Sequence, residues 1–237
     1  MSSERLKMID LFCGAGGLSE GLSEAGFHSL FASEIVPVYA QTYQKNHPNT
    51  TVFTADIREL DANEVQKSLG IERGALDLIA GGPPCQGFSI NAPIRTILDE
   101  RNHLFKEYLR FVDAFAPRAV LIENVPGLVS FEHGATLHAI LDALAELGYG
   151  ADVRILGAPY YGVPQMRWRT IILGVPLYLV YGEGRYLREL IRSRFITLRF
   201  EQILPALLTD NRLSKSLHQR LTPSSSLFMR QLATCLR

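Results

Sequence analysis

Apolar runs and helical patterns alternate along the first 175 residues. Runs of roughly four to eight apolar residues between glycine or polar breaks are typical of buried strands. They predict strands at Lys7–Phe12, Phe27–Glu34, Thr50–Thr54, Ala75–Ala80, Arg118–Ile122, Asp152–Gly157 and Thr170–Gly174. Apolar positions at helical spacing predict helices at Leu18–Ala25, Val36–Asn46, Leu60–Leu69, Asn102–Phe115 and Thr136–Leu147. Because strands and helices alternate, the sequence predicts an α/β fold with a doubly wound, mostly parallel sheet.

The most distinctive stretch, Gly81–Ser89, follows the strand predicted at Ala75–Ala80. Its two glycines and two prolines force a rigid, non-helical turn. The turn presents Cys85 just beyond the carboxyl end of the strand, where open α/β sheets bind their ligands. A lone cysteine is more often a small buried apolar residue. On a stiff loop between Pro84 and Gln86, however, a positioned nucleophile is favoured.

A tight glycine turn, Cys13–Gly17, joins the first predicted strand to the first predicted helix. In such a unit the glycines let the backbone approach a ligand and aim its amide groups at it. Glu34 lies about 20 residues further on, where these folds place a carboxylate on ribose hydroxyls. The turn departs from the strict G-x-G-x-x-G pattern, which disfavours a nicotinamide cofactor.

Charged residues stand at the ends of two later strands. Glu123 directly follows the apolar run 118–122, where a carboxylate needs either an ion pair or a function. Arg167 and Arg169 alternate at the start of the last predicted strand, so both side chains point to the same side. Two guanidinium groups so arranged suit a ligand rich in hydrogen-bond acceptors.

Two regions carry weaker patterns. The polar segment Ile90–Glu100 has no clear period and lies close to Cys85, so it is interpreted as either a mobile lid or a plain surface loop. Beyond Gly174 the periodicity fades, although 186–194 has the pattern of a basic helix. The sequence therefore predicts one domain at 1–175 and a basic appendage at 176–237.

Composition excludes several classes of protein. No run is long and apolar enough to span a membrane, and the first seven residues lack the apolar core of a signal peptide. The prediction is therefore a cytoplasmic protein without a membrane partner. Three cysteines without a Cys-x-x-Cys pair argue against a disulfide framework and a zinc site, so no metal is predicted.

The net charge of zero hides an asymmetry between the two parts of the chain. Residues 1–160 carry 12 Lys/Arg and 20 Asp/Glu, a net charge of −8, whereas residues 161–237 carry 12 and 4, a net charge of +8. A basic terminal third suits a surface that faces a polyanion. A solvated basic tail is the alternative.

The Gly81–Ser89 string resembles, almost letter for letter, the Pro-Cys-Gln nucleophile loop of the DNA (cytosine-5) methyltransferases. The other motifs follow in that family's order over about residues 1–175. The resemblance implies a Rossmann-like methyltransferase fold with S-adenosyl-L-methionine as cofactor, and it implies that Glu34 binds the ribose and Asp56 contacts the adenine. The complete set that it implies for the cofactor is Phe12, Gly14, Gly16, Gly17, Leu18, Glu34, Ile35, Asp56, Ile57, Pro84 and Leu104.

The same resemblance implies a mechanism. Cys85 would add as a thiolate to carbon 6 of cytosine, so that carbon 5 can accept the methyl group. Glu123 would protonate or hydrogen-bond ring nitrogen 3, and Arg169, helped by Arg167, would hold the carbonyl oxygen of the base. The target would be flipped out of double-stranded DNA, with Gln86 and Ser89 in the loop that closes behind it.

The chain departs from the family pattern after the arginine motif. We find neither a Thr-Pro-Arg-Glu-like nor an Asn-Ser-Val-like segment, and only 62 residues follow Val175. The appendage is therefore interpreted as a truncated start of the target-recognition region. Beside an active methyltransferase, two alternatives stay open: the catalytic half of a split enzyme, completed by a second chain, or an inactive truncated fragment.

Two rival functions stay open at this point. A tRNA cytosine methyltransferase uses similar motifs, although the continuation 86–89 looks more like the DNA enzymes. A non-catalytic regulator with the same fold is the other class, against which the intact Cys85 and Glu123 argue. A prokaryotic modification enzyme of a restriction-modification system is the preferred reading.

Overall fold

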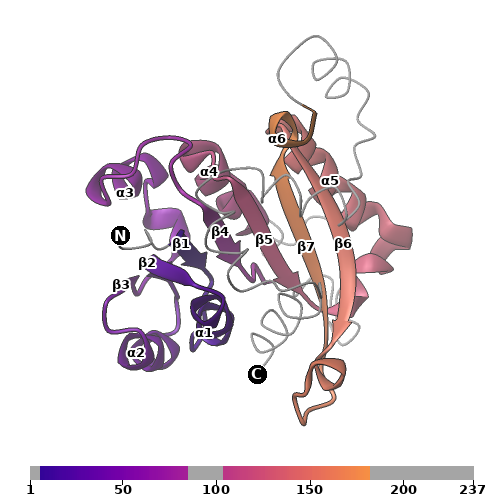
Figure 1. Cartoon of the computed structure of the whole chain (residues 1–237), viewed down its shortest axis with the longest axis horizontal. Coiled ribbons are helices and arrows are strands. Elements are labelled where there is room, and N and C mark those ends of the chain that lie inside the picture. Colours follow the sequence, from indigo (N-terminus) through magenta and orange to yellow (C-terminus); the bar gives the residue numbers. More distant parts are fainter. Residues whose placement is uncertain (1–5, 85–103, 182–237) are drawn as a thin grey trace.

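The computed structural model describes residues 6–84 and 104–181. These residues form a seven-stranded sheet with the order β3-β2-β1-β4-β5-β7-β6 (Figure 1). The strands are β1 (Leu6–Leu11), β2 (Phe27–Ser33), β3 (Thr51–Phe53), β4 (Leu78–Gly81), β5 (Ala119–Asn124), β6 (Tyr149–Gly157) and β7 (Trp168–Pro176). Strands β1 to β5 pair in parallel, and β7 runs antiparallel to β5 and β6. The predicted α/β fold with a mostly parallel sheet is confirmed.

Helices cover both faces of the sheet (Figure 1). On one face lie α1 (Gly17–Glu24) and α2 (Pro37–Asn46), and on the other lie α3 (Ala62–Ser68), α4 (Leu104–Phe115) and α5 (Ala135–Glu146). Shorter elements join them: η1 (Ile57–Glu59), η4 (Pro126–Val129), η5 (Phe131–Gly134), η6 (Ala158–Tyr161) and α6 (Leu177–Tyr181). Leu177 of α6 is fully buried in the same cluster as Leu22 of α1.

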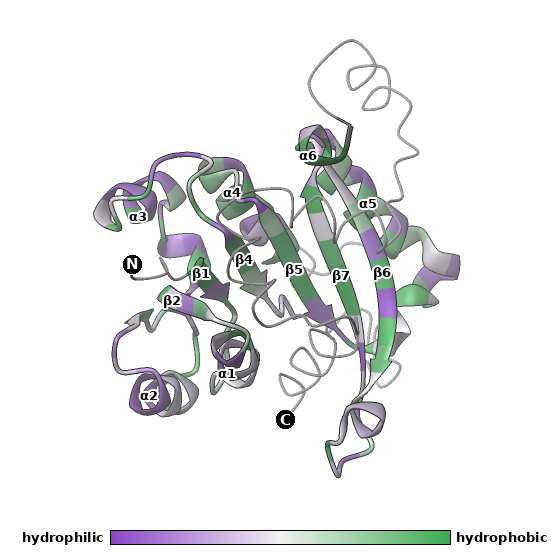
Figure 2. Ribbon diagram, in the orientation of Figure 1, coloured by the Kyte–Doolittle hydropathy of each residue, from purple (hydrophilic) through white to green (hydrophobic). Residues whose placement is uncertain are grey.

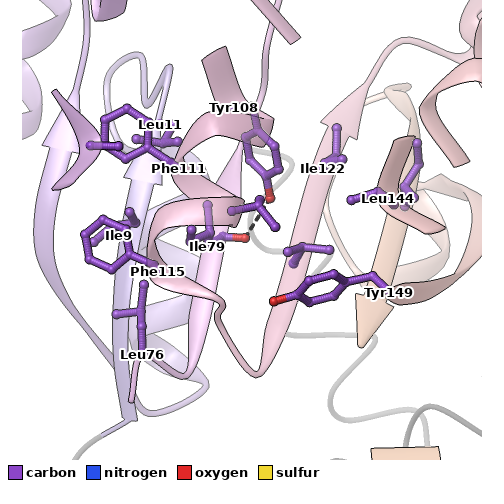
Figure 3. Packing of buried hydrophobic residues seen from close by; sticks show 14 of the residues in the cluster. Ile9, Leu11, Leu76, Ile79, Tyr108, Phe111, Phe115, Ile122, Leu144 and Tyr149 are labelled. Carbon is purple, nitrogen blue, oxygen red and sulfur yellow. Dashed lines mark hydrogen bonds between the residues drawn. The ribbon is translucent and has the colours of Figure 1, made fainter. Parts of the chain in front are cut away.

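The helix α4 shows how sequence pattern becomes packing. Its apolar residues recur at helical spacing, and Tyr108, Phe111, Val112 and Phe115 are all completely buried against the sheet. Figure 3 shows these aromatic rings beside strand residues, and Figure 2 shows that β4, β5 and β7 are apolar along most of their length. The hydroxyl of Tyr108 donates to the carbonyl oxygen of Ile79 at 2.9 Å, so its burial leaves no polar atom unsatisfied.

The five predicted helices and seven predicted strands are present, but several ends differ. The strand expected from Ala75 begins at Leu78, because the amides of Gly74 and Ala75 bond to the carbonyls of Phe115 and Glu72 rather than to a strand. The strands β6 and β7 are longer than predicted, because they pair with each other from Tyr149↔Pro176 to Gly157↔Trp168. Cross-strand pairing of this kind is invisible to local periodicity.

The sheet brings the predicted site segments to one edge. Strands β1 and β4 are neighbours, yet β2 and β3 lie on one side of this pair and β5 on the other. The strand order therefore reverses between β1 and β4, and open α/β sheets bind ligands beside such a switch point. Because β7 is antiparallel, its first residues lie beside the carboxyl end of β5. Several predictions fall outside the described residues: those for Cys85, Gln86, Ser89, the Ile90–Glu100 segment and the helix at 186–194.

Candidate functional site

A pocket of about 130 Å³ opens at the carboxyl edge of the sheet. Its walls come from the segments that follow β1, β2, β3 and β4, and from the first residue of α4. The lining residues are Phe12, Ser33, Glu34, Ile35, Ala55, Asp56, Ile57, Arg58, Pro84 and Leu104. Seven residues predicted for the cofactor are thereby brought together: Phe12, Glu34, Ile35, Asp56, Ile57, Pro84 and Leu104.

The glycine turn fixes the carboxylate of Glu34. The backbone amide of Gly14 donates to Glu34 Oε2 at 2.9 Å, and the amide of Val36 donates to Oε1 at 2.8 Å. Gly14 and Gly16 have φ values of 55° and 95°, a region that glycine adopts without strain. A Cβ on Gly16 would lie 2.9 Å from His47 Nε2, so a larger residue does not fit there. The turn therefore presents Glu34 in one orientation at the pocket wall.

The other predicted residues of the glycine turn and of the start of α1 are not among the residues that line the pocket. Gly16 and Gly17 form the start of α1, and Leu18 packs against the core cluster that contains Leu22. None of these three residues lines the pocket.

A buried polar network that the sequence analysis missed lies beneath this turn. Ser19 Oγ donates to Asp10 Oδ2 at 2.7 Å and lies 2.7 Å from the hydroxyl of Tyr43, which lies 2.9 Å from Ser29 Oγ. Burial raises the pKa of Asp10 to about 7 and raises the pKa of Tyr43 as well. An aspartate inside the apolar run of β1 was the available signal. The network ties α1 and α2 to the strands under the pocket.

Asp56, which also lines the pocket, forms an ion pair with Arg58. Its carboxylate accepts hydrogen bonds from the backbone amide and the Nε of Arg58, each at 3.0 Å. These bonds lower the pKa of Asp56. Arg58 and the neighbouring residues Ser33 and Ala55 line the pocket although the sequence analysis did not select them. Arg58 could have been found only as a basic residue two positions after a predicted ligand.

The second cluster of predicted residues lies at the ends of β5 and β7. Arg169 of β7 forms an ion pair through its Nε with Glu123 Oε1 of β5. Arg167 is half-buried, its Nε has no hydrogen-bond partner among the described residues, and burial and the nearby Arg169 lower its pKa. Gly82 stands directly opposite, since a Cβ there would lie 3.2 Å from Glu123 Oε2. One carboxylate and two guanidinium groups therefore converge beside the loop that leads to Cys85.

Asn124 holds the backbone at Pro83, just before that loop. Its Nδ2 donates to the carbonyl oxygen of Pro83 at 3.2 Å, and its Oδ1 accepts from the amide of Val125 at 2.8 Å. Thr170 of β7 donates to the carbonyl of Val125 at 3.2 Å. Asn124 was not among the predicted site residues, because its contact with Pro83 depends on the pairing of distant strands.

The chain matches the C-5 cytosine-specific DNA methylases over residues 6–209. It belongs to this family. The match extends past residue 175, the limit to which the sequence analysis carried the resemblance. The chain is 46% identical over 169 residues to the Type II methyltransferase M.AgeI of Thalassovita gelatinovora and 41% identical over 171 residues to M1.HphI of Haemophilus parahaemolyticus. Each alignment covers 71% of this chain.

Solved structures of two methyltransferase-like relatives are similar to the described fold. One is a prophage-encoded candidate DNA modification methyltransferase from E. coli, with a TM-score of 0.64, 33% identity and coverage of 73% of this chain and 47% of that one. Another is a mutant of DNMT2 from Spodoptera frugiperda, with a TM-score of 0.59, 26% identity and coverage of 76% and 53%. The chain spans 39% and 45% of the length of M.AgeI and M1.HphI.

The described residues offer neither a metal-binding cluster nor a membrane-spanning helix. Within 6–84 and 104–181, there is no group of three or more His, Cys, Asp and Glu side chains that could hold a metal ion. No helix in this part of the methylase chain is long and apolar enough to cross a bilayer. Cys13 is buried and its pKa is raised by that burial, so its thiol is a structural group rather than a nucleophile.

Proposed function

We propose that this chain carries the catalytic part of a DNA (cytosine-5) methyltransferase, which transfers a methyl group from S-adenosyl-L-methionine to carbon 5 of a flipped-out cytosine. One observation carries the proposal. Glu123, Arg167 and Arg169 converge beside Gly82, three residues before Cys85, and Pro84 of the same segment lines the pocket assigned to the cofactor. Nucleophile loop, base-binding groups and cofactor pocket therefore share one edge of one sheet.

The pocket fits the adenosine part of the cofactor. Each oxygen of Glu34 accepts one backbone amide and keeps a lone pair, which suits the two hydroxyls of a ribose. The apolar side chains of Phe12, Ile35, Ile57 and Leu104 suit an adenine ring, and the Asp56 carboxylate suits its amino group. The bound cofactor supplies an electrophilic methyl group on a sulfonium. Gly14, Gly16, Gly17 and Leu18 would support the glycine turn on the methionine side.

The residues of the chain perform the remaining chemistry. The thiolate of Cys85 would add to carbon 6 of the base, which makes carbon 5 nucleophilic toward the methyl group that the bound cofactor would supply. In its protonated form the carboxyl group of Glu123 would donate to ring nitrogen 3, and its contact with Arg169 holds that group in place. Arg169 and Arg167 stabilise the charge on the carbonyl oxygen. Loss of the proton from carbon 5 and elimination of Cys85 restore the aromatic ring.

Double-stranded DNA is the proposed substrate. The curated relatives named above are Type II methyltransferases, which supports a place in a restriction-modification system on prokaryotic cytoplasmic DNA. The net charge of +8 over residues 161–237 supports a DNA-facing role for that part of the chain. We retain residues 1–175 as the catalytic domain and 176–237 as a basic appendage, with Gln86 and Ser89 in the loop that closes on the base. The second chain stays a prediction.

The test is the transfer of labelled methyl groups from S-adenosyl-L-methionine to mixed-sequence duplex DNA. We expect transfer by the wild-type chain and a loss of at least about 10³-fold in Cys85→Ser, because the nucleophile is removed. Transfer to tRNA in place of DNA would overturn the choice of substrate. A covalent adduct with 5-fluorocytosine DNA is expected from the wild type alone, and its absence would favour a non-catalytic protein.

A further inference from the structure

Arg110 of α4 reaches across to the segment that forms one wall of the pocket. Its Nη2 donates to the carbonyl oxygen of Ile57 at 3.0 Å, and its Nη1 donates to the carbonyl oxygen of Leu60 at 2.5 Å. Ile57 is the first residue of η1 and lines the pocket, and Leu60 directly follows the last residue of η1, so the two bonds hold both ends of this element. The guanidinium is held in turn by Glu107, whose Oε2 accepts from Arg110 Nε at 2.9 Å and Nη2 at 2.6 Å.

The contact joins η1 and α4, which form two sides of the apolar end of the pocket. Ile57 lines the pocket from η1 and Leu104, the first residue of α4, lines it from the helix. Glu107 and Arg110 follow Leu104 by one and two turns of the same helix, on the partly buried side. The rigid, planar guanidinium can bond two carbonyls and a carboxylate at once, which an ammonium group cannot do.

We propose that Arg110 and Glu107 are positioning residues that set the separation between η1 and α4, and thereby the fit of the pocket to the adenine of the cofactor. The inference rests on the proposed function, because it takes the pocket to be the cofactor pocket. Neither residue lines the pocket. Their effect is therefore transmitted through the backbone carbonyls of Ile57 and Leu60.

The chain offers a matched control at the other end of the same helix. Arg73 also bonds to α4, through the backbone carbonyls of Asp113 and Ala114 and through the carboxylate of Asp113 at 3.4 Å. Arg73→Ala therefore removes an arginine with a similar set of contacts. It leaves η1 and the pocket untouched.

The first experiment measures cofactor affinity by calorimetry with S-adenosyl-L-methionine and with S-adenosylhomocysteine. Arg110→Ala should raise the dissociation constant about tenfold, since hydrogen bonds from a charged donor are lost. Arg73→Ala should stay within about twofold of wild type. Glu107→Ala should weaken binding in the same direction, and Glu107→Gln, which keeps an acceptor for Arg110, should restore most of the affinity. In methyl transfer, Arg110→Ala should raise KM for the cofactor and leave kcat within about twofold.

The second experiment measures hydrogen exchange and needs no cofactor. Backbone amides at 57–61 should exchange roughly tenfold faster in Arg110→Ala than in wild type, because this variant frees η1. Their exchange rates in Arg73→Ala should equal those of wild type. Equal affinities for the two alanine variants, or unaltered exchange at 57–61 in Arg110→Ala, would overturn the positioning role. Failure of the wild-type chain to bind cofactor would count against the proposed function instead. The exchange data would still show whether Arg110 holds η1 in place.

Discussion

At the scale of single residues, the site depends on charged groups that are largely shielded from water. Glu123 and Arg169 are both less than a quarter exposed, so each needs the other to offset its loss of water. Arg167 stands beside them with an Nε that no described residue accepts from. A buried donor without a partner is costly. The Nε of Arg167 is therefore placed to donate a hydrogen bond to an incoming acceptor.

Glu123→Gln should reduce methyl transfer by at least about 10²-fold, because the amide cannot supply a proton to ring nitrogen 3. Affinity for S-adenosyl-L-methionine, measured by calorimetry, should change little, since Glu123 does not line the cofactor pocket. Asp152→Asn is the control, because it alters an ion pair with Arg154 on the neighbouring strand β6. Equal activity of Glu123→Gln and the control would refute a catalytic role for Glu123.

Asp10 is a second residue whose charge state matters. It is completely buried, its Oδ1 has no hydrogen-bond partner among the described residues, and its pKa is raised from 3.8 to about 7 by burial. Between these two pH values the unfolded chain releases this proton while the folded chain keeps it. The stability associated with the protonated carboxyl is therefore full below pH 3.8 and is lost as the pH rises through about 7.

Asp10→Asn should remove this dependence, because asparagine carries no titrating proton. The free energy of unfolding of the variant relative to wild type should rise between about pH 4 and pH 8, by an amount on the order of 4 kcal/mol. Urea denaturation at several pH values measures it. Asp61→Asn is a control of opposite sign, since backbone hydrogen bonds lower the pKa of Asp61. A difference between Asp10→Asn and wild type that does not vary with pH would contradict the expectation.

At the scale of elements, close approach of strands decides where side chains are allowed. Strand β4 lies between β1 and β5 at the point where the strand order reverses. A Cβ on Gly81 would lie 2.6 Å from the carbonyl oxygen of Leu11 and 3.1 Å from the ring of Tyr108. Both neighbours are fixed, one as backbone and the other as a buried, hydrogen-bonded ring. The glycine therefore allows β4, and the loop that follows it, to sit against β1.

Gly81→Ala should lower the free energy of unfolding by about 1–3 kcal/mol, because the added methyl group forces β4 away from β1. Urea denaturation of the two proteins measures the loss. Ala75→Ser, at an exposed residue before the strand, should change the value by less than about 0.5 kcal/mol. An unchanged stability of Gly81→Ala would mean that β1 and β4 separate easily at this edge.

At the scale of the whole molecule, the sheet brings together residues that lie far apart in the chain. The pocket draws on segments from Phe12 to Leu104, and the charged cluster joins Gly82, Glu123 and Arg169. Each segment follows or precedes a strand end, so the parallel order of β1 to β5 places them on one edge. The antiparallel β7 adds its own first residues to the same edge.

The sequence by itself determined the order of elements, the residue types in the loops and the class of chemistry. These features depend on local properties: periodicity decides which face of a segment is buried, and glycine and proline decide where the chain turns. Glu34 was selected from its distance to the glycine turn, whereas Phe12, Asp56 and Leu104 were selected from the resemblance to the family, before their common pocket was known. The ends of β4, β6 and β7 were less well predicted, since pairing partners set them.

Only the tertiary structure decided which groups meet. The ion pair between Glu123 and Arg169, the hydrogen bonds of Arg110 to η1 and the burial of Asp10 beside Ser19 and Tyr43 join residues on different elements. No local pattern encodes these contacts, because the distance between two side chains depends on the order in which strands pair and on the face that each helix covers. The physical reason is that sequence fixes the preferences of each segment, whereas the energy of a buried charge depends on what lies against it in space.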